Sequence, residues 1–447
     1  MIAIRPRLAL ASIVAFTPFL SVLWRYRRRL VPLWVGAAVL MLLSSPSQAI
    51  TLEEAVGHGL AIHPSVAAAR AEMEAAGTDV DIARDGYWPT VQASAGPENS
   101  LWGEFGYDLT ASQMLYDWGR VSSQVESASA AERQQLEAFK GTSDEAALDI
   151  IEVYLDVLLY ESRLAAADRH IERLTDLAEL SHDRSGLGYV GRGELERAEL
   201  ELARAREQSA IERGSLVDAK AQFRELVDRP PEDLSWPGSV SMTERLRDAD
   251  TLDVAVAEAP AFRRAHEEVE AAQADREESR AALKPQLNLE GSLLRREIGG
   301  RMEEDAVVAL RVRMDAFQGL SNVRRVEAAS RRVDAARWKQ RATRRELRRE
   351  LSTWIEQDEV FGWRLDSLEE QLDNAREVAD AYREQFEVGL RDIDDLLPIQ
   401  RDLFETERQL SELRSQKLRI QYRVASRLGQ LGEVLNAGHD EDGQGVP

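Results

Sequence analysis

The sequence contains no cysteine, so disulfides, thiolate catalysis, thiolate metal sites and a lipidated N-terminal cysteine are all excluded. Its six histidines never recur at a spacing of three or four residues, so helical pairs of metal ligands are missing as well. Proline and glycine are nearly absent from 120–183 and 320–387, which leaves both stretches free to form very long helices. We therefore expect no metal, no cofactor and two long helical segments.

The first fifty residues have the pattern of a targeting segment. Four arginines between 25 and 29 precede an apolar stretch, Val31 to Leu43, which is followed by Ser47-Gln48-Ala49. The apolar core of 13 residues is shorter than the roughly 20 that a spanning helix needs. The pattern predicts a secretory signal peptide over 1–49, with an N-terminal extension over 2–24 that it does not explain.

Acidic side chains outnumber basic ones in the rest of the chain. Without 1–49, it carries 51 basic and 79 acidic side chains, a net charge of −28. Such a protein repels nucleic acid, so we expect no nucleic-acid partner.

The sequence contains an internal duplication. His63-Pro64 and Trp88-Pro89 lie 25 residues apart, as do Ala259-Pro260 and Lys284-Pro285, at an offset of 196. Farther along, an offset of 201 aligns Gly188 with Gly389 and Leu195 with Leu396. A repeat of this length is too long for a solenoid unit and indicates the duplication of a whole half-structure.

Each repeat is predicted to contain a helix, a β-hairpin and a pair of long helices. The hairpins fall at 87–118 and 285–317, and the helix pairs turn at 186–193 and 388–395. Apolar residues at alternating spacings of three and four predict antiparallel coiled coils. The predicted organisation is a signal peptide over 1–49, a first repeat over 50–230, a linker over 231–250, a second repeat over 251–432 and an acidic, disordered tail over 433–447.

The hairpins alternate between apolar and polar residues. Phe105, Tyr107 and Leu109 share one face of a strand, and Asp108 and Thr110 share the other. Four such strands of about 10 residues are long enough to cross a bilayer when tilted, although two water-soluble hairpins packed on helices would show the same alternation. Two hairpins cannot close a barrel alone, so a spanning barrel requires several protomers. Aromatic residues at the strand ends predict an interfacial girdle of Tyr87, Trp88, Trp102, Tyr116 and Trp118.

One motif is typical of an enzyme. Gly186-Leu187-Gly188-Tyr189-Val190-Gly191 matches the dinucleotide-binding fingerprint. That fingerprint requires a preceding strand within a βαβ unit, and a coiled-coil helix is predicted here instead. We interpret the glycines as a helical turn and expect no enzyme activity.

Four segments carry a resemblance to a known family. In order, they are Thr51-Leu52-Glu53-Glu54-Ala55, Gly86-Tyr87-Trp88-Pro89, Leu115-Tyr116-Asp117-Trp118-Gly119-Arg120 and the stretch from Phe386 to Leu397. With the duplication, they make the chain resemble the TolC family of outer-membrane channels over essentially all of the sequence after the signal peptide. The fold class that this implies is mostly α, with long coiled-coil helices forming a periplasmic tunnel and four strands contributed to a trimeric transmembrane β-barrel.

The resemblance also implies partners. They are two further copies of the chain, outer-membrane lipid, a periplasmic adaptor (a membrane fusion protein) and an inner-membrane transporter of the ABC type. The turns that it implies contact the adaptor contain Gly188, Tyr189, Val190, Gly191, Val388, Gly389 and Leu390.

In the family, acids ring the pore at the tip of the tunnel and polar links hold the tip closed. Asp395 matches one pore acid, whereas Pro398 stands where a second acid is expected. Arg391 matches the linking arginine and Glu194 matches its acidic partner, while Phe386 replaces a linking tyrosine. The resemblance therefore implies a weaker latch than the family's.

The function expected from this resemblance is an exit duct across the periplasm and the outer membrane. Tyr116-Asp117-Trp118-Gly119 is most similar to the type I secretion members, including those paired with large adhesins, so protein export is favoured over small-molecule efflux. A soluble periplasmic coiled-coil adaptor or scaffold is the alternative reading.

Overall fold

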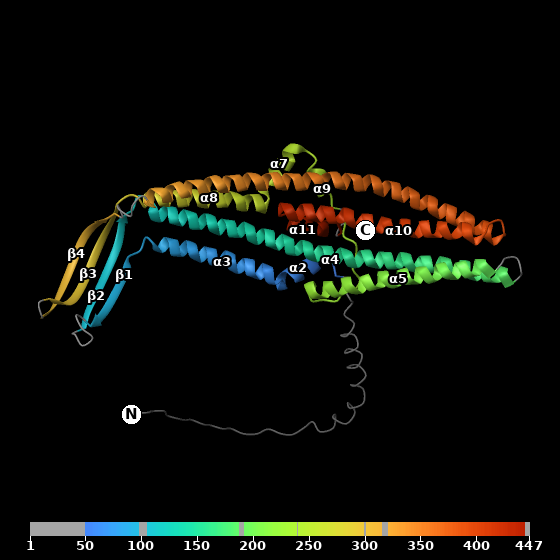
Figure 1. Ribbon diagram of the computed structural model, residues 1–447, viewed down its shortest axis with the longest axis horizontal. Helices are drawn as coiled ribbons and strands as arrows, with labels where there is room; N and C mark the ends of the chain where they lie inside the picture. The colour runs from blue at the N-terminus through green and yellow to red at the C-terminus, as the bar shows by residue number, and fades with distance from the viewer. Residues whose placement is uncertain are drawn as a thin grey trace, which may run out of the picture. The chain divides into compact units, whose positions relative to one another are not determined.

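Two copies of one unit, with two helices, a hairpin and two long helices, make up the fold (Figure 1). The computed structural model describes residues 50–97, 105–186, 192–238, 240–298, 301–314 and 321–442. The first unit contains α2 (Leu52–Ile62), α3 (Pro64–Asp85), β1 (Thr90–Pro97), β2 (Phe105–Tyr116), α4 (Arg120–Gly186) and α5 (Arg192–Val227). The second contains α7 (Ala249–Glu258), α8 (Pro260–Ala281), β3 (Gln286–Ile298), β4 (Arg301–Arg313), α9 (Ser321–Glu387) and α10 (Ile393–Leu428).

The two units match element by element. α3 and α8 both have 22 residues, α4 and α9 both have 67, and α5 and α10 both have 36. Their first residues are separated by the two sequence offsets, 196 for the first pair and 201 for the other two. The equivalence therefore extends to single residues.

The first predicted helix is broken in two. α2 ends at Ile62, and Pro64 occupies the first turn of α3. N–H groups in a first turn have no partner within the helix, so the N–H that proline lacks costs no hydrogen bond. Pro260 has the same place in α8. At the start of α2, Thr51 accepts a hydrogen bond from the Glu54 N–H at 3.2 Å, which satisfies one free donor of the first turn.

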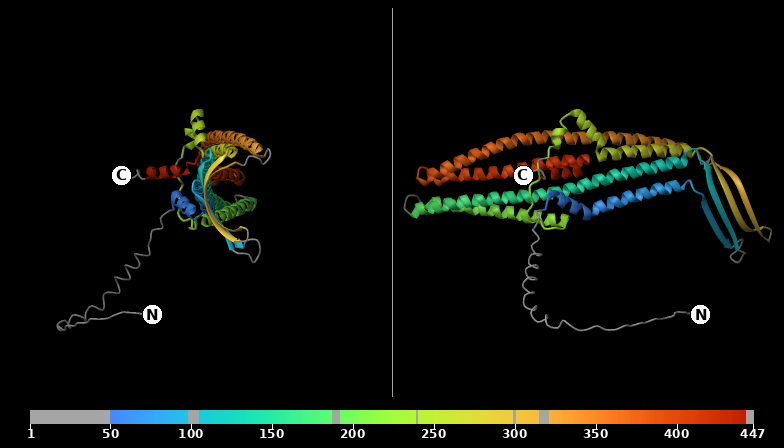
Figure 2. Two further views of the ribbon diagram at one scale, coloured as in Figure 1. Left: turned by 90° about the vertical axis from the view of Figure 1, so that its left-hand side faces the viewer. Right: turned by 180° about the vertical axis from the view of Figure 1, so that it is seen from behind.

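The four strands form one antiparallel sheet in the order β1-β2-β3-β4. Within it, Leu109 of β2 lies opposite Ala93 of β1 and Leu293 of β3. The pairing of β2 with β3 joins the two units, and β1 and β4 are the edges. Figure 2 shows the sheet as a curved layer.

Beside the sheet, α3, α4, α8 and α9 lie next to one another in the order of the strands that they adjoin (Figures 1 and 2). Farther along, toward the helical turns, the order is α5, α4, α10, α9. α4 and α9 run through both layers. No helix in the described ranges combines the length and the apolar character needed to cross a membrane.

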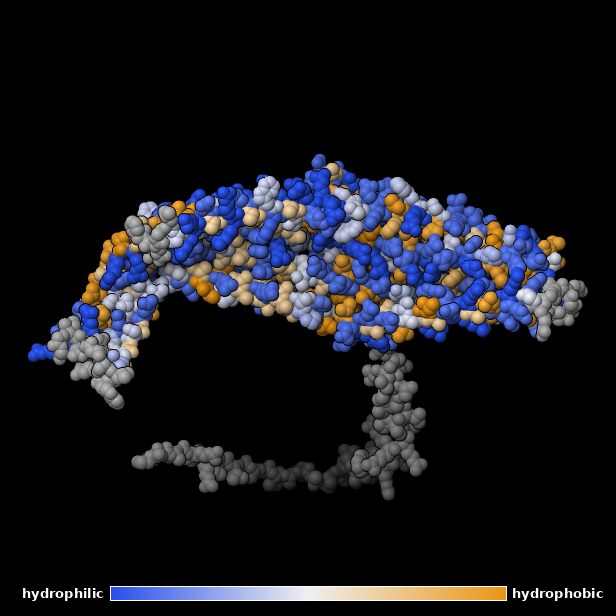
Figure 3. All heavy atoms as spheres, in the orientation of Figure 1, coloured by the Kyte–Doolittle hydropathy of each residue, from blue (hydrophilic) through white to orange (hydrophobic). Residues whose placement is uncertain are grey.

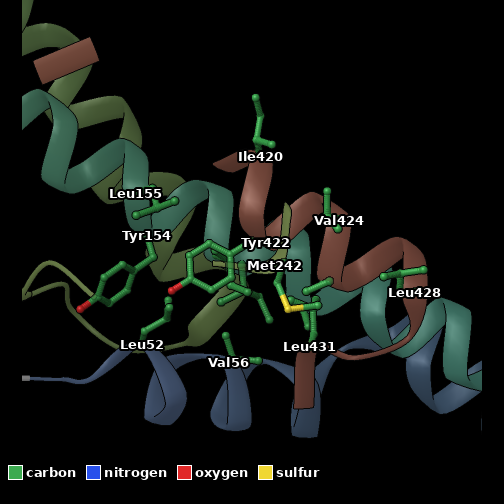
Figure 4. Packing of buried hydrophobic residues seen from close by; sticks show 14 of the residues in the cluster. Leu52, Val56, Tyr154, Leu155, Met242, Ile420, Tyr422, Val424, Leu428 and Leu431 are labelled. Atoms are coloured by element: carbon green, nitrogen blue, oxygen red, sulfur yellow. The ribbon is translucent and has the colours of Figure 1, made fainter. Parts of the chain in front are cut away.

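The main core lies where the two layers meet, and Figure 4 shows part of it. Tyr154, Leu155 and Tyr422 pack there with Leu52, and the Tyr154 hydroxyl donates to the Ser235 carbonyl at 2.8 Å. The residues between the units belong to this core: α6 (Met242–Arg245) places Met242 in it, about 5% exposed.

Residues 433–442, the described part of the disordered tail predicted over 433–447, belong instead to a helix, α11 (Leu431–Asp442). Leu431 is 1% exposed and belongs to the main core, with Val434 and Leu435 packed against it. The packing of the apolar residues at the start of the segment therefore holds it in a helix, although its end is acidic.

We predict that Gly429→Ala destabilises the fold. Gly429 ends α10 with φ of 75°, and a Cβ there would lie 2.6 Å from Pro260 Cγ. Positive φ costs a residue other than glycine about 1–3 kcal/mol, before the clash is added. Thermal unfolding of purified Gly429→Ala and Gly432→Ala should show a loss only for the first, because a Cβ on Gly432 meets nothing within 4 Å. Equal melting temperatures would contradict this account of the turn.

We predict that Asp144 makes the fold less stable as the pH rises. Burial raises the pKa of Asp144 to about 7, from 3.8 for an ordinary aspartate. The unfolded chain releases this proton at lower pH than the folded chain, so stability falls as the pH rises between those two values. In Asp144→Asn, the dependence of the melting temperature on pH should be flatter from pH 4 to about 7. An unchanged slope would mean that other carboxyl groups dominate it.

Candidate functional site

The sheet exposes its apolar face. On β2, Phe105, Tyr107 and Leu109 are 63%, 40% and 40% exposed, and on β4 Val308 is 80% exposed. Figure 3 shows hydrophobic residues along the outer border of the sheet, whereas hydrophilic residues prevail on the visible face of the helices. A water-soluble hairpin would bury these side chains. The structure therefore disfavours the alternative of soluble hairpins packed on helices.

The opposite face of the sheet is polar and better covered. Asn288 and Glu290 are 5% and 6% exposed. Glu290 forms ion pairs with Arg311, at 2.6 Å, and with Arg313 on the neighbouring strand. The Thr110 hydroxyl on the same face donates to Ser292 Oγ at 3.2 Å. The sheet therefore has one covered polar face and one exposed apolar face.

The predicted girdle residues lie at the end of the sheet that adjoins the helices. Tyr87, Trp88, Tyr116 and Trp118 are all exposed, by 45% to 70%, and the last two rings meet edge to face at 4.9 Å. Trp102 lies outside the described residues. At the other end, an Arg295–Glu304 ion pair follows the apolar stretch of β3 and β4. The exposed apolar residues are thus bounded by aromatic rings on one side and by charges on the other.

Asp117 builds the junction between strand and helix. Its carboxylate accepts hydrogen bonds from the N–H groups of Gly119, at 3.0 Å, and Val121, at 2.7 Å, at the start of α4. Trp118 has φ of 62°, and its Nε1 donates to the Pro285 carbonyl of the other repeat at 2.9 Å. The Tyr116-Asp117-Trp118-Gly119 motif is therefore a structural joint between the sheet and the helices.

The second helical turn is described in full. Gly389 has φ of 79°, which favours glycine, and its neighbours Val388 and Leu390 are 72% and 77% exposed. The first turn is described only up to Gly186, so Gly188, Tyr189, Val190 and Gly191 lie outside the described residues. α4, a helix, precedes that turn where a dinucleotide-binding motif would need a strand.

The structure brings Arg391 to Asp395 rather than to Glu194. Arg391 lies 3.5 Å from the Asp395 carboxylate, donates to Gln385 Oε1 at 2.9 Å and stacks on the Tyr382 ring at 3.8 Å. All of these partners belong to the second repeat. Within one chain, Arg391 therefore stabilises its own turn.

Glu194 lies beside other charges. Its Oε2 atom is buried without a hydrogen-bond partner. Burial raises the pKa of Glu194, the guanidinium of Arg184 lowers it, and the carboxylate of Asp392 raises it.

Arg184 links the two repeats at the tip, which the sequence did not predict. Its Nη1 donates to the Phe386 carbonyl at 3.0 Å, and its guanidinium lies 4.4 Å from the centre of the Phe386 ring. Phe386 is fully buried, and it binds the guanidinium of Arg184 through its ring face and its main-chain carbonyl. Arg197 forms a second link, to Asp394. Neither arginine has a spacing that distinguishes it from the other charged residues of these helices.

Among the described residues, no group of three or more histidine, aspartate or glutamate side chains is placed to hold a metal ion. The features that the structure does assemble are a sheet with an exposed apolar face and long paired helices that end in polar turns. Such an arrangement has the form of a sheet suited to a membrane, carried on a long helical extension.

The family model described as outer membrane efflux protein matches residues 57–228 and 251–430, and the chain belongs to this family. The resemblance to TolC-type channels is thereby confirmed. No curated protein sequence matches the chain.

Solved structures share the fold at low sequence identity. The outer membrane protein VceC from Vibrio cholerae has 15% identity and a TM-score of 0.71, covering 85% of this chain and 96% of its own. The Campylobacter jejuni CmeC channel has 14% identity and a TM-score of 0.70, covering 89% and 90%. The open state of the Neisseria gonorrhoeae MtrE channel has 19% identity and a TM-score of 0.70, covering 85% and 89%. The fold class is thus that of channels with a helical tunnel and a β-barrel part, and the chain is placed in the outer membrane with its helices in the periplasm.

We predict that the two faces of β2 respond differently to arginine. If the apolar face meets lipid, Leu109→Arg should cost about 2–4 kcal/mol near the midplane, whereas Asp108→Arg on the covered polar face should be mild. Membrane assembly, measured by fractionation and heat-resistant migration on gels, reports both. Equal effects of the two neighbouring substitutions would refute the assigned facing.

Proposed function

We propose that the chain is a passive exit duct of a tripartite export system and works as a homotrimer. The observation that carries this proposal is the sheet with its apolar face exposed, its polar face covered and both edges unpaired. Unpaired edge strands are not tolerated in lipid, so several copies must share one closed barrel. The partners are a periplasmic adaptor, bound at the helical turns, and an inner-membrane transporter of the ABC type.

We propose protein as the cargo, delivered by type I secretion and including large surface adhesins. This rests on the likeness of Tyr116-Asp117-Trp118-Gly119 to type I members. In the structure this motif has an architectural part, because Asp117 caps α4 and Trp118 binds the other repeat. Small-molecule efflux is the second candidate, and the description of the matched family favours it. Deleting the gene and comparing the secreted proteins with drug and metal tolerance distinguishes the two.

We propose that the pore is narrowest at Asp395 in the tip turns. We also propose that the latch which closes the tip is weak, because the chain has no second pore acid. In the structure, Arg391 compensates part of the charge of Asp395 at 3.5 Å. Arg184 holds Phe386 and so ties the two turns together. The exposed Arg391–Asp395 ion pair contributes about 0–1 kcal/mol, which the contacts of an adaptor can overcome.

We predict that Arg391→Ser raises single-channel conductance in planar bilayers without affecting folding. The substitution frees the Asp395 carboxylate to attract cations, and the change should be smaller in high salt, where the pair is already screened. Asp395→Ala should reduce cation selectivity. Arg376→Ser is the control, because Arg376 pairs with Asp373 on its own helix. Unchanged conductance and selectivity in both tip variants would place the constriction elsewhere.

A further inference from the structure

A charged cluster lies on the polar face of the sheet, at the end next to the helices. Glu290 is 6% exposed, and its two carboxylate oxygens are bound by arginines of the neighbouring strand, by Arg311 at 2.6 Å and by Arg313. Two guanidinium groups therefore share one carboxylate. The cluster keeps one positive charge, although the chain as a whole has a net charge of −22.

Both arginines keep N–H groups that Glu290 does not use. Their side chains are 57% and 61% exposed. Among the described residues, the side chains of Arg311 and Arg313 have no hydrogen-bond or ion-pair partner other than Glu290. A guanidinium donates from several N–H groups at once, so each arginine can bind a second acceptor.

The fold does not require arginine at these two positions. The offset of 201 between the repeats turns Arg311 into Thr110 and Arg313 into Ser112. The strand register agrees, because Ser112 lies opposite Thr90 and Arg313 lies opposite the residue 196 positions after Thr90. Short hydroxyl side chains therefore occupy the same places in the first repeat, and the positive charge is not needed to build the sheet.

We propose that Arg311 and Arg313 form an oxyanion-binding site on the wall of the channel, where the sheet adjoins the helices. The inference rests on the proposed barrel, in which the polar face of the sheet lines the lumen. The ligands are phosphate and carboxylate groups, because adjacent guanidinium groups match the several oxygens of such a group. Each copy of the chain brings one site to the lumen.

Glu290 positions the two guanidinium groups and also limits their affinity. It lies on β3, between β2 and β4, and its burial fixes the carboxylate that both arginines bind. The arginines are therefore held in place before a ligand arrives. The same carboxylate offsets one of their two positive charges. An anion on the wall of a channel has to be released again, and the partly neutralised site allows this.

The site is opposite in charge to Asp395, the acid proposed for the constriction. Acidic side chains in a pore favour cations, whereas arginines favour anions. Loss of the two arginines should therefore shift the reversal potential in planar bilayers toward cation selectivity, and Asp395→Ala should shift it the other way. A general defect of folding or assembly would not give shifts of opposite sign.

Calorimetric titration of the detergent-purified protein with inorganic pyrophosphate measures the site directly. Arg311→Thr with Arg313→Ser introduces the residues of the first repeat and should weaken binding at least about tenfold, because hydrogen bonds between charged groups are lost. Arg295→Gln is the matched control. Arg295 belongs to the same hairpin but to the opposite face, where it pairs with Glu304, and its loss should leave the affinity unchanged.

Glu290→Gln separates ligand binding from a structural role. The substitution removes the negative charge that competes for the two guanidinium groups, so pyrophosphate should bind more tightly than to the wild type. If the cluster only stabilised the sheet, this substitution and the double arginine variant would both lower the melting temperature, and neither would change the affinity.

Competition identifies the source of the ligand. Displacement of pyrophosphate by a peptide of glutamates indicates acidic segments of an exported protein, whereas displacement by inorganic phosphate alone indicates free phosphate. Equal pyrophosphate binding by the wild type and the double arginine variant, or no binding by the wild type, would overturn the site and leave the channel proposal in place. A wild type without channel currents in planar bilayers would overturn the proposed function, whatever the titration shows.

Discussion

The constraint on which the structure depends is the hydrogen bonding of the backbone at the two edges of the sheet. β1 and β4 each have one side without a partner strand, and lipid offers no donor or acceptor to replace one. In the proposed function, further copies of the chain close these two edges. The helices beside the sheet share this incompleteness, since α3 and α9 form the two ends of the layer that follows the strand order. The outer helices of this layer therefore lack a neighbour on one side, as the edge strands do.

The solvent preferences of the chain reverse between the sheet and the helices. In the sheet, the apolar side chains are exposed, and Glu290 is covered and paired with two arginines. In the helices, leucines such as Leu372 and Leu403 are buried in the seam between α9 and α10, and most of the charged side chains are outside. The reversal occurs within a few residues at Asp117, which fixes the start of α4 while Trp118 turns the chain. A short rigid joint allows two different environments to meet at a sharp boundary.

The sequence was sufficient to predict the features that depend on periodicity. Alternation predicted the four strands and the apolar face that contains Leu109, but not whether that face is exposed. The lack of proline and glycine predicted helices of the observed length. The offsets predicted which elements are equivalent. The helix in the predicted tail was missed because the acidic composition does not show that Val434 and Leu435 pack against the core.

The contacts at the tip were not predictable in the same way. Arg391 was assigned a partner in the other repeat, and the structure pairs it with Asp395, four residues away on its own turn. The link between repeats comes instead from Arg184 and Phe386, a cation and an aromatic ring that are 202 residues apart. A motif reveals such a link only when both of its residues belong to the motif. Phe386 belongs to the stretch from Phe386 to Leu397, but Arg184 does not.

The equal lengths of the paired helices restrict how such a chain can evolve. α4 and α9 have the same number of residues, and so do α5 and α10. Lengthening α4 alone by seven residues would move the connection between α4 and α5 about 10 Å beyond the connection between α9 and α10. It would also shift α4 against the residues that it packs with. A longer or shorter protein of this kind therefore requires four matched insertions or deletions, one in each long helix. Point substitutions face no such coupling, so helix length should diverge far more slowly than sequence among its descendants.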